Sequence, residues 1–226
     1  NRLFKLCLVH FKKNLLNKKL SIPELYFNTA NFNHLLIDDG NGLEIFFEKE
    51  IEKTNNIRKK IAIAPGAYHF TKQWGINKFS ELINLIKNKY DFEIFLLGGA
   101  SDKKICQEIL EKTDNFPKDF SGEKSVLKTA EILSNCDLLV TNDTGVMHIA
   151  AARKIPIVAI FGSTTTDFGF APYRVNHRII EVDLKCRPCT HIGRSKCPKK
   201  HFNCMNLISA ERVLEAVEEI VMKEKE

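Results

Sequence analysis

Short apolar runs alternate with longer amphipathic stretches along the chain from residue 61 onward. The runs with the length of buried strands lie at residues 61–64, 92–97, 137–141, 156–161 and 178–182. Apolar residues elsewhere recur every three or four positions, which predicts helices near residues 76–86, 101–113, 126–133, 146–153 and 209–221. A short element of unassigned type is expected near Phe120. Repeated strand–helix units predict an α/β fold, a Rossmann-like doubly wound parallel sheet with helices on both faces.

Residues 1–55 follow a different pattern, in which no strand–helix unit is complete. Apolar residues from Leu3 to Leu15 recur at helical spacing and predict one amphipathic helix. Residues 22–26 have the character of an extended linker, and residues 43–47 that of a short strand. We interpret residues 1–55 as the remnant of an N-terminal domain, with a linker that crosses over to a domain formed by residues 56–226.

Composition places the chain among globular proteins, with 226 residues of which 44% are hydrophobic and 27% charged. No apolar run is long enough to span a bilayer and no signal-peptide pattern is present, so we expect a cytoplasmic protein without a transmembrane segment. The net charge of +6 is spread over lysine-rich faces, which favours a solvated surface over a polyanionic or membrane-surface partner. We expect no nucleic-acid partner. The chain begins with Asn1 instead of methionine, which indicates a fragment or a processed product.

The most informative motif is Thr141-Asn-Asp-Thr-Gly-Val-Met-His148, which follows a predicted strand and leads into a helix rich in alanine. At such a junction, the backbone N–H groups of the helix N-terminus favour an anion beyond the edge of the sheet. Gly145 allows a ligand to approach the backbone closely. Asp143 and His148 would flank that ligand with an acceptor and a donor. The alternative is an ordinary strand–helix turn with an Asp or Thr cap.

Two further loops at predicted strand ends carry polar side chains. In the loop 65–74, Lys72 could place its ammonium group on a phosphate, with Trp74 packed beneath it. The alternatives are a surface lysine and a tryptophan in the core. The loop 161–173 is rich in hydroxyl groups that can bind phosphate or sugar oxygens, and its alternative interpretation is a solvated turn. Because ligands of parallel sheets bind beyond the carboxyl ends of the strands, we expect the three loops to line one cleft.

In chain order the three loops contain P-G-A-x-x-x-x-K-x-W, T-N-D-T-G-x-M-H-I-A-A and F-G-S-T-T-T-D-F-G-F-A-P. Taken together, they resemble the ADP-heptose:lipopolysaccharide heptosyltransferase family, which are inverting glycosyltransferases of the GT-B fold. The third loop is most similar to that of heptosyltransferase II members. The resemblance covers residues 56–226 and implies that they form the C-terminal, nucleotide-sugar donor-binding half of a GT-B glycosyltransferase.

The resemblance also implies a role for each motif residue. Lys72 would contact the donor diphosphate, and Asp143 and His148 would reach sugar hydroxyls or phosphate oxygens. The other donor-binding candidates supply backbone N–H groups or hydroxyls: Thr144, Gly145, Val146, Ser163 and Thr164. Ser163 departs from the family pattern, because many relatives carry proline there. The family's catalytic base lies in an N-terminal domain that residues 1–55 do not resemble, so no catalytic residue is assigned in this chain.

The activity implied by the resemblance is transfer of heptose from ADP-heptose to the inner core of lipopolysaccharide, with inversion and without a cofactor. The acceptor would lie at the inner-membrane surface, with the protein peripheral to it. Two alternatives stay open: a transferase with another nucleotide-sugar donor, and a nucleotide-binding fragment without catalysis. A nicotinamide oxidoreductase is disfavoured, because no G-x-G-x-x-G motif follows the first predicted strand.

A cysteine segment near the C-terminus is the remaining candidate for chemistry. It reads Cys186-x2-Cys189-x7-Cys197-x6-Cys204. Paired thiolates at such spacing can form a structural zinc site. The second pair is spaced more widely than in a zinc ribbon, and thiols stay reduced in a cytoplasmic protein. The cysteines are therefore weak metal candidates, and we expect free thiols or an adventitious disulfide and no metal.

Overall fold

The computed structural model describes residues 2–15, 21–33, 35–49, 51 and 57–223. Its centre is one sheet of six parallel strands in the order β3-β2-β1-β4-β5-β6. The strands are β1 (Lys60–Ala64), β2 (Glu93–Gly98), β3 (Lys118–Ser121), β4 (Leu138–Asn142), β5 (Ile157–Ile160) and β6 (His177–Ile180). The chain order reverses between β1 and β4, so their carboxyl ends form the switch point at which such sheets bind ligands.

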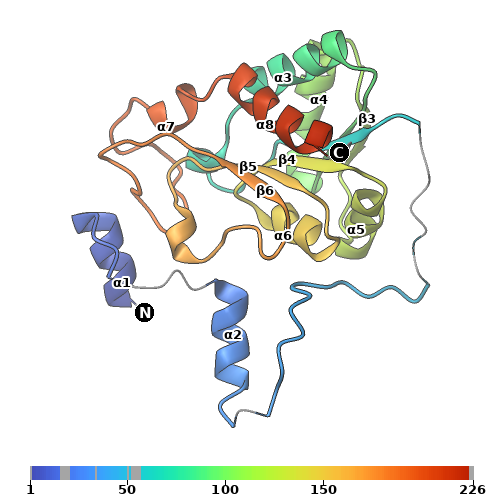
Figure 1. Cartoon of the computed structure of the whole chain (residues 1–226). Helices are drawn as coiled ribbons and strands as arrows, with labels where there is room; N and C mark the ends of the chain where they lie inside the picture. Colours follow the sequence, from blue (N-terminus) through green and yellow to red (C-terminus); the bar gives the residue numbers. More distant parts are fainter. Residues whose placement is uncertain (1, 16–20, 34, 50, 52–56, 224–226) are drawn as a thin grey trace.

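Helices cover both faces of the sheet, as the strand–helix pattern predicted (Figure 1). One face carries α3 (Ile76–Lys89), α4 (Lys103–Lys112) and α8 (Ala210–Lys223). The other carries α5 (Val126–Ser134) and α6 (Gly145–Ala152). Alternation along β1 explains the two layers: Ile61 and Ile63 face the first set of helices, whereas Ala62 and Ala64 face α6. The small side chains on that face allow the alanine-rich α6 to pack closely over the switch point.

The remaining elements are short. They are α7 (Asn203–Asn206) and the 3₁₀ turns η2 (Phe70–Lys72), η3 (Ala100–Asp102) and η4 (Thr166–Phe168). The element expected near Phe120 is the edge strand β3, whose half-exposed Lys-Asp-Phe-Ser sequence contains no apolar run. Within the described residues, no helix has both the length and the apolar character needed to cross a bilayer.

The N-terminal residues differ from two of the expectations. A helix does run from Arg2 to Phe11, as α1 (Arg2–Leu6) and the π-helical turn η1 (Cys7–Phe11). The predicted linker at 22–26 is wrong, because these residues begin α2 (Ile22–Ala30). The signal was present in the sequence: Ser21 and Glu24 form a capping box, in which each side chain accepts a hydrogen bond from the other residue's N–H.

The predicted strand at 43–47 is also wrong, since these residues belong to no strand. Two of their carbonyl groups accept hydrogen bonds from basic side chains at the end of α6 instead of from a neighbouring strand. Arg153 donates to the carbonyl of Ile45 (3.2 Å), and Lys154 donates to that of Leu43 (2.9 Å). The apolar alternation of the segment instead places its side chains beside α6, where the Arg153 guanidinium lies over the Phe47 ring.

Candidate functional site

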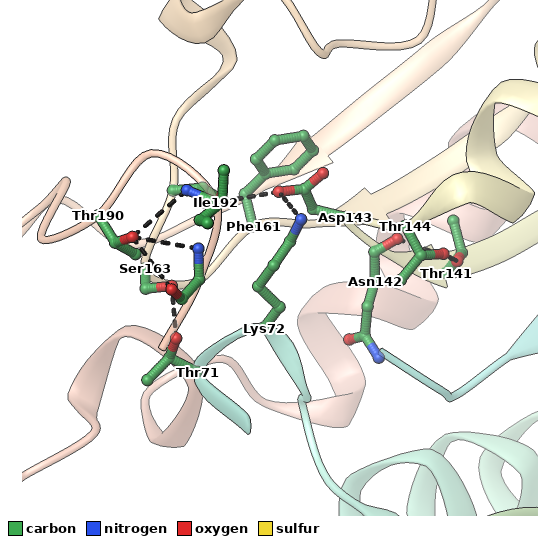
Figure 2. A network of polar contacts seen from close by, with 12 residues as sticks. Thr71, Lys72, Thr141, Asn142, Asp143, Thr144, Phe161, Ser163, Thr190 and Ile192 are labelled. Carbon is green, nitrogen blue, oxygen red and sulfur yellow. Dashed lines mark hydrogen bonds and ion pairs between the residues drawn. The ribbon is translucent and has the colours of Figure 1, made fainter. Parts of the chain in front are cut away.

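The three loops predicted to share a cleft meet at the carboxyl edge of the sheet (Figure 2). Lys72, from the loop after β1, places its Nζ 2.8 Å from Oδ2 of Asp143, which follows β4. Thr164, from the loop after β5, donates its hydroxyl to the same carboxylate oxygen at 2.7 Å. Asp143 therefore joins all three loops through one side chain.

The Lys72–Asp143 pair is largely withdrawn from water, with 16% of the lysine side chain and 8% of the aspartate side chain exposed. Burying two charges is costly, and their attraction compensates only when further hydrogen bonds complete the pair. Thr164 supplies one such bond. The pair is consequently a preformed charged group, and it presents one cation and one anion to the space around it.

Asn142, the last residue of β4, fixes the first loop against the motif. Its carboxamide oxygen accepts from the N–H of Trp74 (3.1 Å), and its nitrogen donates to the carbonyl of Pro65 (2.8 Å). Trp74 is a core residue: it is buried edge-on against Phe79 and donates its indole N–H to the carbonyl of Ile208. The alternative interpretation of Trp74 is thus the correct one, and Asn142 is a site-forming residue that the motif analysis did not single out.

Two pockets border the ion pair. A pocket of about 460 Å³ lies between the first loop, the carboxyl end of β2 and the start of α5. A pocket of about 260 Å³ lies between α6, the third loop and residues 191–192. Both are lined by Lys72, Asp143, Thr144 and Gly145. An extended ligand that occupies both pockets must pass the ion pair and the N-terminus of α6.

The N-terminus of α6 faces this open space. Thr144 is its N-cap residue and Gly145 its first residue, and the first N–H groups of a helix have no partner within the helix. A Cβ built on Gly145 would meet no protein atom within 4 Å. The glycine is therefore not required by packing of the chain itself, and its absent side chain leaves the pocket open. Val146 lines the larger pocket only.

His148 lines the smaller pocket one turn further along α6. Burial lowers its pKa, the Asp143 carboxylate acts in the opposite direction, and the Lys72 ammonium lowers the pKa further. The imidazole is thus neutral at pH 7, with one nitrogen that donates and one that accepts. Its ring lies edge-on to Phe170, another residue of the same pocket. A neutral imidazole beside an aromatic ring suits a sugar with several hydroxyl groups.

Ser163 and Thr164 are placed differently from each other. Thr164 lines the smaller pocket and bonds to Asp143. Ser163 is 1% exposed, lines neither pocket, and donates its hydroxyl to that of Thr71 at 2.9 Å. The structure therefore does not place the Ser163 side chain where a donor could touch it. A hydroxyl-rich sequence cannot distinguish these cases, because both residues satisfy the same compositional rule.

Arg187 is a further residue that motif analysis missed. Its side chain is only 9% exposed; it donates to the carbonyls of Gly162 and Thr164 and pairs with the carboxylate of Glu181 at 2.7 Å. It thereby holds the third loop against the end of β6. A single arginine between two cysteines carries no sequence signal for this role, because its partners are main-chain carbonyl groups.

The cysteine segment contributes His191 and Ile192 to the lining of the smaller pocket. All four of its cysteines are free thiols, and Cys186 Sγ lies 3.9 Å from Nε2 of His201. Burial raises the pKa of Cys204 to about 11 and also raises the pKa of Cys189, so both stay protonated at neutral pH. Among the residues that the structure describes, no group of three or more His, Cys, Asp or Glu side chains is arranged to hold a metal ion.

Comparison with known proteins gives a consistent result. Residues 28–200 match the family model described as glycosyltransferase family 9 (heptosyltransferase). Lipooligosaccharide heptosyltransferase 2 of Campylobacter jejuni is 31% identical over 170 residues, which are 74% of this chain and 52% of the relative. Lipopolysaccharide heptosyltransferase 2 of Escherichia coli is 25% identical over 173 residues, which are 74% of this chain and 48% of the relative. The chain spans about half the length of these relatives.

Solved structures share the fold. The glycosyl transferase family 9 protein of Veillonella parvula has a TM-score of 0.74 at 20% identity, covering 93% of this chain and 62% of that one. ADP-heptose lps heptosyltransferase II of Escherichia coli has a TM-score of 0.61 at 22% identity, covering 95% of this chain and 56% of that one. These likenesses show a common α/β architecture. Because the family match extends over most of the sequence, the chain belongs to glycosyltransferase family 9, the heptosyltransferase family.

Proposed function

We propose that residues 56–226 are the donor-binding half of a heptosyltransferase and bind ADP-heptose across the two pockets. The observation that carries this proposal is the position of the Lys72–Asp143 pair between the pockets, next to the N-terminus of α6. The nucleoside fits the larger pocket, which has the size of a typical small-molecule site, and the sugar fits the smaller one. The diphosphate then lies at the lysine and the first N–H groups of α6.

In this arrangement the two charged residues have separate tasks. Lys72 offers the diphosphate those N–H donors that do not pair with Asp143, and Gly145 lets the phosphate oxygens approach the helix backbone. Asp143 is an acceptor for sugar hydroxyls at the entrance of the smaller pocket, held in place by Thr164. His148 offers a further donor or acceptor to the same sugar.

The reaction is an inverting transfer of heptose to the inner core of lipopolysaccharide. Lipooligosaccharide and lipopolysaccharide are the substrates in the names of the relatives. An acceptor hydroxyl loses its proton to a general base, attacks the anomeric carbon and displaces ADP. Negative charge grows on the leaving diphosphate, where Lys72 and the α6 N-terminus stabilise it. We expect this base from the half of the transferase that residues 56–226 do not form. The acceptor would be presented at the cytoplasmic surface of the inner membrane, with the protein peripheral to it.

Titration calorimetry with ADP, UDP and ADP-heptose tests the binding step. ADP is expected to bind more tightly than UDP. ADP-heptose is expected to bind more tightly than ADP, because the sugar adds contacts in the smaller pocket. Absence of ADP binding would contradict the proposal. A transfer assay with an inner-core acceptor then separates a transferase from the second candidate, a nucleotide-binding module, which the same pockets would serve.

A further inference from the structure

The lysine assigned to the diphosphate directly follows a buried threonine. Thr71 is 1% exposed and lines neither pocket, so its side chain does not reach a ligand in either one. Lys72, the next residue, lines both pockets. The two residues belong to the same 3₁₀ turn, η2, so a displacement of the Thr71 backbone would carry the lysine with it. The contacts that hold Thr71 therefore help to set the position of the ammonium group.

Two other segments of the chain hold Thr71 through hydrogen bonds. The N–H of Thr71 donates to the carbonyl of Arg194 (3.1 Å), and the N–H of Arg194 donates to Oγ1 of Thr71 (2.8 Å). The hydroxyl of Ser163 donates to the same Oγ1 (2.9 Å), and its N–H donates to the Thr71 carbonyl (3.3 Å) (Figure 2). The N–H, the carbonyl and the hydroxyl of Thr71 are thus all bonded to residues that lie far away in the sequence.

The turn 190–194, which presents Arg194 to Thr71, is closed by one of its own side chains. The Thr190 hydroxyl accepts from the N–H of Gly193 (3.1 Å) and donates to the carbonyl of the same residue (3.2 Å). Gly193 has a φ of +119°, and a Cβ built on it would collide with the side chain of His69. The turn therefore packs closely on the first loop at His69 as well as at Thr71.

We propose that Thr71 is a positioning residue, which fixes Lys72 beside the donor diphosphate by tying the first loop to the turn 190–194. The inference rests on the proposed function, in which Lys72 contacts the diphosphate. Asp143 pairs with the ammonium group at one end of the lysine side chain, and the Thr71 contacts fix the backbone at the other end. A side chain that is already in place when the ligand arrives loses less conformational freedom on binding.

Calorimetry on the 226-residue chain with ADP and with adenosine tests the proposal. Adenosine lacks the diphosphate, so its affinity depends on the larger pocket and not on Lys72. Thr71→Val keeps the shape of the side chain and removes the hydroxyl, whereas Thr71→Ser keeps a hydroxyl at the same place. Lys72→Ala and the double variant Thr71→Val/Lys72→Ala complete a cycle that measures whether the two residues act together.

A second variant changes the same contact from the opposite side. Gly193→Ala would push the turn 190–194 away from His69 and leaves the Thr71 hydroxyl in place. Its matched control is Gly40→Ala, because Gly40 also has a positive φ (+81°), lines neither pocket, and would place its Cβ within 4 Å of no atom. If Thr71→Val does not fold, Gly193→Ala is combined with Lys72→Ala in the same cycle.

We expect Thr71→Val to weaken ADP binding by about fivefold, within the range for residues that interact directly, and to change adenosine binding by less than about twofold. Thr71→Ser should bind ADP within about twofold of the wild-type protein. In the Lys72→Ala background, Thr71→Val should have no further effect, because the lysine that it positions is absent. Gly193→Ala should behave like Thr71→Val, and Gly40→Ala like the wild-type protein.

Three results would each overturn the proposal: equal losses of ADP and adenosine affinity in Thr71→Val, a full Thr71→Val effect without Lys72, or equivalence of Thr71→Ser and Thr71→Val. A structural role alone would produce the first two results, because it would act on the whole site whether or not the lysine is present.

The proposed function fails by a different observation, the absence of ADP binding by the wild-type chain. The positioning role is then measured through His148, because the Lys72 ammonium lowers the pKa of its imidazole. In an NMR titration, Lys72→Ala should raise the pKa of His148, and Thr71→Val should shift it in the same direction. A pKa of His148 that rises in Lys72→Ala and stays unchanged in Thr71→Val would overturn the positioning role without any ligand.

Discussion

The loops after β4 and after β5 leave the same edge of the sheet, and both are rich in polar residues, but they use those residues differently. In the loop after β4, Asp143, Thr144 and Gly145 line both pockets. In the loop after β5, Ser163 bonds to Thr71 inside the protein, and the carbonyls of neighbouring residues accept from Arg187. The loop after β4 presents its polar groups to both pockets. The loop after β5 presents Thr164 and Thr165 to the smaller pocket and uses Ser163 and main-chain carbonyls to fix its own shape.

Thr164 connects the two loops. It belongs to the loop after β5 and donates to Asp143 of the loop after β4. The loop after β5 therefore supports the loop after β4 through a single hydroxyl. We therefore expect variants of the two loops to differ in which property they change. Substitutions in the loop after β4 should change ligand affinity and spare stability, whereas substitutions that release the loop after β5 should do the reverse.

The largest effect is expected for Arg187→Ala. It leaves buried carbonyls of the loop after β5 without their donor, and such unsatisfied groups cost about 1–3 kcal/mol each. We expect the free energy of unfolding in urea to fall by about 3 kcal/mol. The matched control is Arg178→Ala, which removes an exposed pair with Glu219 and should cost at most about 1 kcal/mol. Equal losses for the two variants would contradict the supporting role of Arg187.

Lys72→Ala is expected to have the largest effect on binding. Removing the ammonium from the diphosphate should weaken ADP affinity by about 1.5–3 kcal/mol in calorimetry, the range for a hydrogen bond to a charged group. Lys104→Ala, an exposed lysine of α4, serves as the control and should leave the affinity unchanged. An unchanged affinity in Lys72→Ala would contradict a contact with the diphosphate and leave Lys72 only its ion pair with Asp143.

Asp143→Asn should separate sugar recognition from nucleotide binding. Asparagine keeps the size of the side chain and an acceptor for Thr164, and it removes the charge that pairs with Lys72. We expect ADP affinity to be retained, while the preference for ADP-heptose over another ADP-sugar falls by about 1.5 kcal/mol. Calorimetry with the three ligands and a thermal melt measure both. Parallel losses of ADP affinity, ADP-heptose affinity and stability would make Asp143 a structural cap.

Gly145→Ala separates the requirements of folding from those of ligand binding most sharply. The residue is helical, and an added Cβ would meet no protein atom within 4 Å, so the fold tolerates alanine. Alanine favours the helix by up to about 1 kcal/mol over glycine. A ligand at the backbone would meet the new methyl group, and we expect a loss of about tenfold in ADP affinity, or ~1.4 kcal/mol. Lower stability with unchanged affinity would contradict a ligand at the α6 N-terminus.

The comparison of the two loops also explains what the sequence could predict. The sheet followed from apolar runs at residues 61–64 and 92–97, because buried parallel strands need continuous apolar residues. The meeting of Lys72 and Asp143 followed from their positions after strands. The inward direction of Ser163 did not, because hydroxyl groups in either direction are compatible with the same loop composition.

Other features depend on contacts that have no local pattern. Arg187 bonds to main-chain carbonyls, which every residue possesses, so no residue type marks its partners. The edge strand β3 was predictable only as an element, since its residues are half exposed and lack an apolar run. The capping box of Ser21 and Glu24 is different, because its spacing is a recognised helix start and the linker interpretation overlooked it.

The smallest effect is expected at the cysteine segment, which borders the loop after β5. Ser163 accepts through its carbonyl from the N–H of Cys189 (3.1 Å), so the segment is already held without a metal. A structural zinc would contribute folding energy directly, and a chelator would then unfold the segment. Burial raises the pKa values of Cys189 and Cys204, so a metal bound there would have to displace their protons. We therefore expect excess EDTA to leave the melting temperature and the ADP affinity unchanged. One zinc per chain, found by elemental analysis of protein purified without added metal, would contradict this and make the segment a metal-folded unit beside the transferase cleft.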